Sequence, residues 1–367
     1  MYLAEDRILS LGIYCQQKSQ YTLAYVPDAV AFTDPMKTHQ ALLGQRRRWI
    51  NSSLFAFLYV WRNYYFNVLE SDHNCIRSYI TINLSMILAG LSFVNSYFTP
   101  SLYFFVLYIT ILQIDNQSQA CADLAVIVSG LYCFIILAAI GGSLIGKEWE
   151  KHAHIVSAIL SIFTFAMFGL VVYNIVEIYL NFSDLRLESF RQGATIIMIL
   201  INIGSIFLIV FVHIFTHPRF VFKLLCDSIS YMSFQGAYSQ TMVIYGMCNV
   251  DDVSWGTKGA TGSGGVSRFF TNKVFFVSSW LFYNCVLAYI LIYVDVVVPQ
   301  RVGNQGGIVL LGICIYATVQ IGIKTLFAFL NFMHWVFAHK ICGLKFDVPQ
   351  NNVLMTQRKW IKLKQAF

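Results

Sequence analysis

The run Gln45-Arg46-Arg47-Arg48-Trp49 combines three cations with an indole, and it stands just before a long hydrophobic region. Arginine guanidinium groups bind a diphosphate through paired hydrogen bonds and stay charged at any working pH. The apolar face of a tryptophan is a platform for a sugar ring. These residue types together suit a site that handles phosphate and sugar at once.

A second cluster, Glu5-Asp6-Arg7, places acidic groups upstream of the arginine run. A carboxylate can act as a general base by taking the proton from an attacking hydroxyl. Acidic residues in the first turn of a helix often serve only to complement the helix dipole. The position of this triplet, ahead of the arginine run and a membrane bundle, makes it a candidate catalytic group.

The composition is that of a membrane protein: 57% of the 367 residues are hydrophobic and only 12% are charged. An ordinary soluble domain carries about twice that share of charged residues. The net charge of +7 comes from cations gathered in a few segments, which is typical of membrane topology rather than of nucleic-acid binding. The nine cysteines include no Cys-x-x-Cys, so buried thiols are expected rather than a metal site. We therefore predict a polytopic α-helical membrane protein with no nucleic-acid partner.

Seven hydrophobic stretches follow the arginine run, and all but the second are long enough to cross a bilayer. The second begins directly after Pro100 and could instead be re-entrant or interfacial. The stretches cover residues 78–98, 101–114, 122–145, 154–181, 193–216, 273–298 and 307–337. Most Lys and Arg lie outside them, in segments that the positive-inside rule assigns to the cytosol. Six crossings place both termini in the cytosol, whereas seven would place the basic tail outside.

A third motif, Ser254-Trp255-Gly256-Thr257-Lys258-Gly259, lies between the main group of stretches and the final pair. Its glycine content is also that of a flexible loop. The wording Gln45 to Ser52 together with the Trp255 to Gly259 loop resembles chitin synthases, which are processive family 2 glycosyltransferases. Cellulose and hyaluronan synthases lack this loop motif, so it separates these groups.

This resemblance implies that Asp6 is the general base that deprotonates the acceptor hydroxyl. Glu5 and Arg7 would orient Asp6 and tune its pKa. The Ser254 to Gly259 loop would lie in the cytosol, where Trp255 could reach a catalytic centre or a channel gate.

The resemblance also assigns roles within the arginine run. Gln45 and Arg48 would contact the donor diphosphate, and Trp49 would stack on the acceptor sugar at the mouth of a channel. Arg46 and Arg47 would be either phosphate contacts or electrostatic support.

The implied reaction transfers N-acetylglucosamine from UDP-GlcNAc to the C4 hydroxyl of a growing chitin chain, with inversion, and the bundle exports the polymer. Mg²⁺ or Mn²⁺ is implied as a cofactor, but no Asp-x-Asp occurs in the sequence, so its ligands are expected outside this chain. We therefore expect the C-terminal part of a synthase, without the nucleotide-binding half and inactive alone. A multi-pass location in the plasma membrane with a cytosolic active site, and a homodimer as one possible assembly, complete the expectation.

The resulting domain plan starts with the end of a cytosolic GT-A-type α/β domain and an interfacial helix, followed by about six transmembrane helices. Its parts are 1–53 for the GT-A piece, 54–77 for the interfacial helix, 78–216 for the first transmembrane cluster, 217–272 for the cytosolic segment with the loop motif, 273–337 for the final transmembrane pair and 338–367 for a basic tail. Two alternatives stay open: another processive synthase of hyaluronan or cellulose type, and a non-catalytic channel or scaffold subunit.

Overall fold

The computed structural model describes seven ranges of the chain and a few isolated positions between them. The ranges are residues 36–62, 83–114, 118–145, 147–180, 218–252, 266–297 and 308–335. All regular secondary structure within them is helical, which agrees with the predicted α-helical class. The predicted GT-A piece falls largely outside the described residues.

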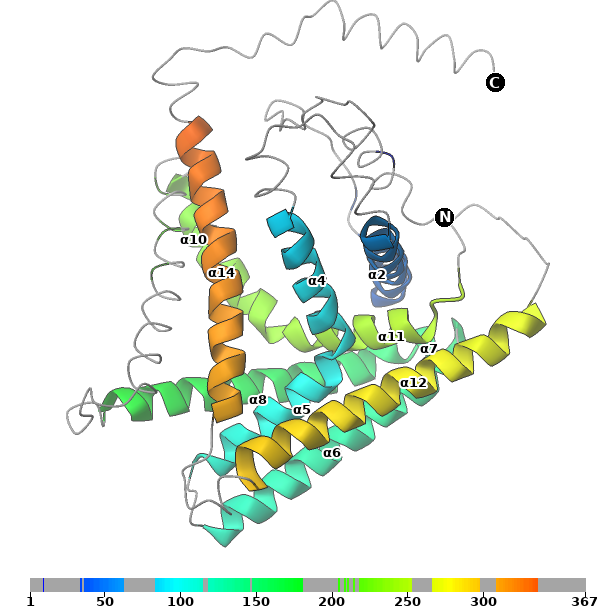
Figure 1. Ribbon diagram of the computed structural model, residues 1–367, viewed down its shortest axis with the longest axis horizontal. Helices are drawn as coiled ribbons and strands as arrows, with labels where there is room; N and C mark the ends of the chain where they lie inside the picture. The colour runs from blue at the N-terminus through cyan, green and yellow to red at the C-terminus, as the bar shows by residue number, and fades with distance from the viewer. Residues whose placement is uncertain are drawn as a thin grey trace, which may run out of the picture. The chain divides into compact units, whose positions relative to one another are not determined.

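The chain divides into two compact units, residues 1–189 with 225–313 and residues 190–224 with 314–367. The described contacts of the arginine run lie in the first unit. Its helices are α2 (His39–Arg62), α4 (Asn83–Tyr97), α5 (Thr99–Leu112), α6 (Gln119–Ile145), α7 (Lys147–Glu150), α8 (Ala153–Leu180), the π-helical turn η3 (Ala237–Thr241), α11 (Met242–Cys248), α12 (Val266–Ile292) and the π-helical turn η4 (Tyr293–Val297) (Figure 1). The helix α10 (Pro218–Ser233) ends in this unit, and α14 (Ile308–Trp335) begins in it and continues in the second.

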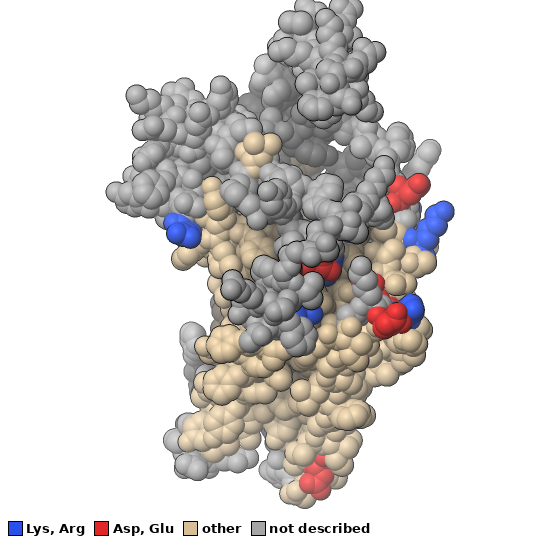
Figure 2. All heavy atoms as spheres, turned by 90° about the vertical axis from the view of Figure 1, so that its right-hand side faces the viewer, with Lys and Arg blue, Asp and Glu red and all other residues tan. Residues whose placement is uncertain are grey.

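Three helices among the described residues are long and apolar enough to cross a membrane: Gln119–Ile145, Ala153–Tyr173 and Lys273–Val297. They correspond to the third, fourth and sixth predicted stretches. Many of their exposed side chains are apolar, as Phe134 at 70% and Phe282 at 63% exposure illustrate. In Figure 2 the lower part of the described surface is largely uncharged, whereas charged side chains lie across the middle and at the lower end. Such wide apolar surface suits contact with lipid. The count of six crossings remains a prediction, since the fifth stretch lies mostly outside the described residues.

The region predicted as the first span and a short second piece forms two short helices, α4 and α5, with a break at Phe98. Pro100 causes the break, because proline has no N–H to donate and its ring clashes with the preceding turn of a helix. It fits in the first turn of a helix, which is its position in α5. In an unbroken helix the Ser101 N–H would donate to the Tyr97 carbonyl; here it donates to Asn284 Oδ1 at 3.3 Å.

The carbonyl of Tyr97 that the break sets free is satisfied from α12. Trp280 Nε1 donates to this oxygen at 2.7 Å, and Asn284 Nδ2 donates to it at 3.2 Å. The Ser101 hydroxyl lies 2.6 Å from Asn284 Oδ1. A buried carbonyl without a partner is costly, so these contacts tie α12 to the junction of α4 and α5.

The core of the first unit lies where α5, α6, α8, η3 and α11 meet (Figure 1). Tyr132 of α6 donates to Gln240 Oε1 at 2.7 Å, and Gln240 Nε2 donates to Thr164 Oγ1 of α8 at 2.9 Å. Gly236 lies against the backbone of Leu160 so closely that a Cβ would overlap its carbonyl group. This close approach is what lets the segment leading into α11 pack on the long helices.

Replacing Asn284 by alanine should destabilise the first unit, because the Ser101 N–H loses its buried acceptor and the Tyr97 carbonyl loses one of its two donors. The Ser101 hydroxyl keeps the main-chain carbonyl of residue 284, 2.7 Å away. The expected loss is about 1–3 kcal/mol, seen as a lower thermal midpoint of the detergent-solubilised protein. Cys285→Ala, at the exposed neighbouring position, is the matched control. Equal midpoints for the two variants would contradict this account.

Candidate functional site on the arginine helix

The arginine run lies in the middle of α2, a single helix that continues to Arg62. The Ala41 N–H donates to Thr38 Oγ1 at 3.2 Å, which is an N-cap contact at the start of the helix. The aromatic segment that the sequence assigns to an interfacial helix from residue 54 continues α2 without a break as far as Arg62. The arginines and this aromatic segment therefore share one rigid element.

Helical geometry sends the five residues of the run in different directions, because successive residues turn by about 100° and residues three or four apart share a face. Arg47 points into the protein together with Leu43 and Asn51, which are both fully buried. Arg46 and Trp49 share a second face. Gln45 and Arg48, the two predicted diphosphate contacts, share a third and are half-buried.

Arg47 forms an ion pair with Asp252, which follows the end of α11. The exposed fraction of the Arg47 side chain is 7%, and that of Asp252 is 32%. Burial lowers the pKa of Arg47, while Tyr245, Glu150 and Asp251 nearby oppose that shift. Arginine stays protonated under these conditions, so the cation is buried as a charge and needs this acidic surrounding.

Asn249, at the C-cap of α11, forms a second anchor for α2. Asn51 Nδ2 donates to the Asn249 carbonyl oxygen at 3.0 Å. The Asn249 side chain donates to the Ser143 carbonyl of α6 at 3.2 Å and accepts from Lys273 Nζ of α12 at 3.0 Å. Lys273 also lies 3.7 Å from Asp251. One asparagine thus connects the arginine helix to both α6 and α12.

Arg46 and Trp49 pack against each other on the second face of α2. The guanidinium carbon of Arg46 lies 4.6 Å from the Trp49 ring centroid and 5.9 Å from that of Tyr238, which are cation–π distances. The indole is 50% exposed. Trp49 therefore has its orientation supported by a cation and still offers free surface to a ligand.

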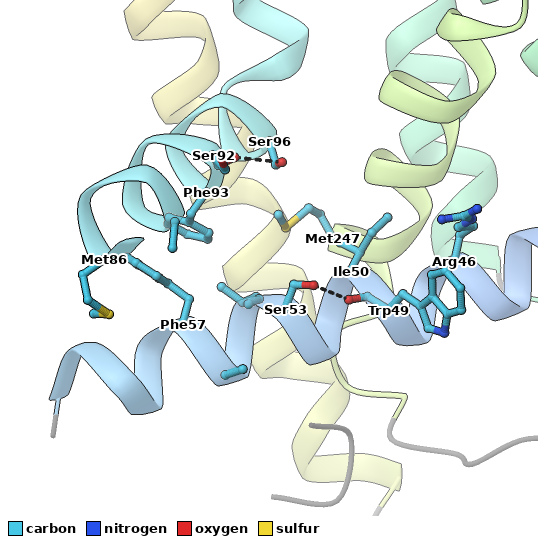
Figure 3. A pocket seen from close by; sticks show the side chains of 13 residues that line it. Arg46, Trp49, Ile50, Ser53, Phe57, Met86, Ser92, Phe93, Ser96 and Met247 are labelled. Atoms are coloured by element: carbon cyan, nitrogen blue, oxygen red, sulfur yellow. Dashed lines mark hydrogen bonds between the residues drawn. The ribbon is translucent and has the colours of Figure 1, made fainter. Parts of the chain in front are cut away.

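This face opens into a pocket of about 730 Å³ between α2 and α4, which Met247 of α11 also lines (Figure 3). Arg46 and Trp49 lie at one end, and Phe57 with Met86 at the other. The volume is within the usual range for a small-molecule site. Most of the side chains that line the pocket are apolar. Two of its hydroxyls, those of Ser53 and Ser96, already donate to carbonyls of their own helices, at 2.7 and 3.0 Å. Such a wall suits the apolar faces of sugar rings or an acyl chain.

The remaining predicted site residues, Glu5-Asp6-Arg7 and Ser254 to Gly259, lie outside the described residues. The sequence analysis did not identify Glu150, Asn249, Asp251, Asp252 and Lys273 as neighbours of α2. One signal was available: Asp251-Asp252 comes directly before the loop motif, and two adjacent carboxylates beside a basic run are natural partners for its cations.

Arg47→Met should destabilise the protein far more than Arg48→Met, because it leaves the Asp252 carboxylate without its cation. Breaking a fully buried pair costs about 3–5 kcal/mol, and the partial exposure of Asp252 reduces the expected loss to about 2 kcal/mol. Thermal midpoints in detergent measure the difference. The double variant Arg47→Asp with Asp252→Arg should recover part of the loss, and equal effects at positions 47 and 48 would refute the assignment.

Cys248 should resist alkylation at pH 8, whereas the exposed Cys226 should react. Burial raises the pKa of the Cys248 thiol to about 12, which Lys273 offsets only in part. The reactive thiolate is therefore on the order of 1 part in 10,000 at pH 8. Mass spectrometry after a maleimide pulse checks this, and labelling of both cysteines at similar rates would contradict the packing of α11.

Comparison with known proteins shows which family this chain is similar to. The family model for the chitin synthase-like glycosyltransferase domain matches residues 1–64, which include the acidic triplet and the whole of α2. Curated relatives include chitin synthase 2 of Candida albicans, 27% identical over 272 residues, and chitin synthase C of Aspergillus oryzae, 30% identical over 281 residues. Each alignment covers 71% of this chain, but only 27% and 29% of the relative. The chain thus spans little more than a quarter of the length of these relatives, and within that span it is a chitin synthase-like protein.

Proposed function

We propose that this chain is part of an enzyme that transfers N-acetylglucosamine from UDP-GlcNAc to the C4 hydroxyl of a growing β-1,4 chain. The observation that carries the proposal is the placement of the arginine run. Within the region matched by the family model, one helix presents Arg46 and Trp49 to a pocket and turns Gln45 and Arg48 to another face. Cation and sugar platform are thereby held on one rigid element.

In this proposal the acceptor oxygen attacks C1 of the donor sugar from the side opposite to the leaving UDP, which inverts the anomeric centre. Asp6 takes the proton of the acceptor hydroxyl, with Glu5 and Arg7 orienting it. Gln45 and Arg48 bind the diphosphate as charge develops on the leaving oxygen, a role that suits a guanidinium group.

The structure supports separate roles for the other two arginines. Arg47 is buried against Asp252, so it supports the helix electrostatically and is not a phosphate contact in this proposal. Arg46 packs on Trp49 and supports the platform for the acceptor sugar. The pocket beyond Trp49 would take the next sugar units of the acceptor.

The proposal includes a divalent cation on the donor diphosphate, but the described residues do not form a site for it. They contain no group of three His, Cys, Asp or Glu side chains able to hold an ion. Asp251 and Asp252 face Lys273 and Arg47. No step of the mechanism is therefore assigned to this chain through the metal.

Export of the polymer through the membrane bundle, a plasma-membrane location and a cytosolic active site belong to the same proposal. The helices able to cross a membrane support it, and so does Lys273 at the first residue of one of them, where the positive-inside rule places the cytosol. The Ser254 to Gly259 loop starts two residues after Asp252 and would lie on that side. A homodimer is the assembly to test first.

The test uses membranes that carry a longer protein containing this sequence and a nucleotide-binding half. They should incorporate label from UDP-GlcNAc into a polymer that chitinase digests. Label from UDP-glucose or a hyaluronidase-sensitive product would instead favour another processive synthase. The purified 367-residue chain alone should incorporate no sugar.

In that longer protein, Trp49→Ala should lower polymer synthesis at least about tenfold, because losing a large apolar contact costs roughly 1.5–3 kcal/mol. Trp61→Ala is the matched control, since Trp61 is a similarly exposed indole on the same helix that does not line the pocket. Asp6→Asn should abolish synthesis while membrane insertion stays normal. If Asp6→Asn and Trp49→Ala are both silent, the chain is a non-catalytic channel or scaffold subunit.

A further inference from the structure

Glu150 ends α7, the four-residue helix between α6 and α8, which are two of the helices able to cross a membrane. Its carboxylate accepts a hydrogen bond from the Tyr245 hydroxyl of α11 and another from Gln40 Nε2 of α2 at 3.3 Å. The Glu150 side chain therefore contacts both the arginine helix α2 and helix α11.

Gln40 is exposed and lies in line with the buried face of α2, one turn before it. Gln40, Leu43, Arg47 and Asn51 follow each other at spacings of three, four and four residues, so they share one face. Three of them are polar and bind three separate points: Glu150, Asp252 and the Asn249 carbonyl. Glu150 also lies near enough to Arg47 to oppose the lowering of its pKa.

The position of Glu150 is itself fixed by packing. The preceding residue, Trp149, stacks on Tyr245 with ring centroids 5.9 Å apart. A Cβ on Gly142 of α6 would overlap the Trp149 indole, so only glycine leaves room for it there. Burial raises the pKa of Tyr245, and the hydrogen bond to Glu150 raises it further. The Tyr245 hydroxyl therefore keeps its proton and remains a hydrogen-bond donor at neutral pH. The packing of Trp149 on α6 and α11 therefore fixes this turn independently of its contact with α2.

A further contact holds the start of α2 to the same end of the bundle. His39 Nε2 lies 3.0 Å from the Ser157 hydroxyl of α8, and Leu43 packs against Ala153 at the beginning of α8. The α6–α7–α8 connection therefore contacts α2 along its first two turns. These contacts lie several residues before Trp49 and add to the anchors at Arg47 and Asn51.

We propose that Glu150 is a positioning residue for the arginine helix. It holds α2 in the rotation that buries Arg47 and directs Arg46 and Trp49 to the pocket, and so couples this helix to the turn between α6 and α8. The consequence for sugar transfer rests on the proposed function, whereas the effect on α2 does not.

Hydrogen exchange on the 367-residue chain in nanodiscs tests the effect on α2 directly. Glu150→Ala should accelerate amide exchange in α2 about tenfold, because the lost hydrogen bonds involve a charge, and should leave α12 unchanged. Glu148→Ala is the matched control, since Glu148 lies in the same helix but is exposed and pairs only with Lys151 among the described contacts. Unchanged exchange in α2, or equal acceleration along the whole chain, would overturn the proposal.

Tyr245→Phe provides a second variant if Glu150→Ala does not fold. It keeps the ring on Trp149 and removes only the hydroxyl that holds Glu150, so it should accelerate exchange in α2 by a smaller factor in the same direction. No change in α2 for this variant would also count against the proposal.

Kinetics on the longer protein separate this inference from the proposed function. Glu150→Ala should lower kcat/KM for UDP-GlcNAc at least about fivefold at equal amounts of folded protein, and Glu150→Asp should restore part of it. If the wild-type protein makes no polymer, the proposed function fails, while the exchange result still decides the role of Glu150. If the wild type is active and both Glu150→Ala readouts match the wild type, only the inference about Glu150 fails.

Discussion

Burying the charge of Arg47 is the constraint on which the arrangement around α2 depends. A guanidinium group cannot shed its proton to escape the cost of burial, so the protein must surround it with anions and fixed dipoles. Asp252 comes from the segment after α11, and Glu150 from the turn between α6 and α8. The charge interactions of Arg47 therefore bring together elements that are far apart in the sequence.

This constraint gives the three arginines of the run different positions and therefore different roles. A helix that commits Arg47 to the interior must direct its neighbours elsewhere, because three consecutive residues cannot share a face. Arg46 and Trp49 then line the pocket, and Gln45 and Arg48 lie on a face of their own. Three arginines that look equivalent in the sequence thus have different chemistry available to them.

The long helices supply the frame that makes this burial stable. Pro100 interrupts what would be one span, and the freed carbonyl of Tyr97 is satisfied by Trp280 and Asn284 of α12. Asn249 then connects α12, through Lys273, to the arginine helix. Polar groups at helix breaks and ends, rather than apolar packing alone, specify which helices meet.

The sequence by itself determined the helical membrane class, three of the helices able to span, the break near Pro100 and the residue types of the arginine run. These follow from local properties: hydropathy over about twenty residues, the missing N–H of proline, and the chemistry of guanidinium and indole groups. The partners of Arg47 and Asn51, the pocket beside Trp49 and the contacts of Glu150 were decided only by the tertiary structure. Each of them joins residues roughly 40 to 200 positions apart, and no local pattern specifies which distant carboxylate will meet a given cation.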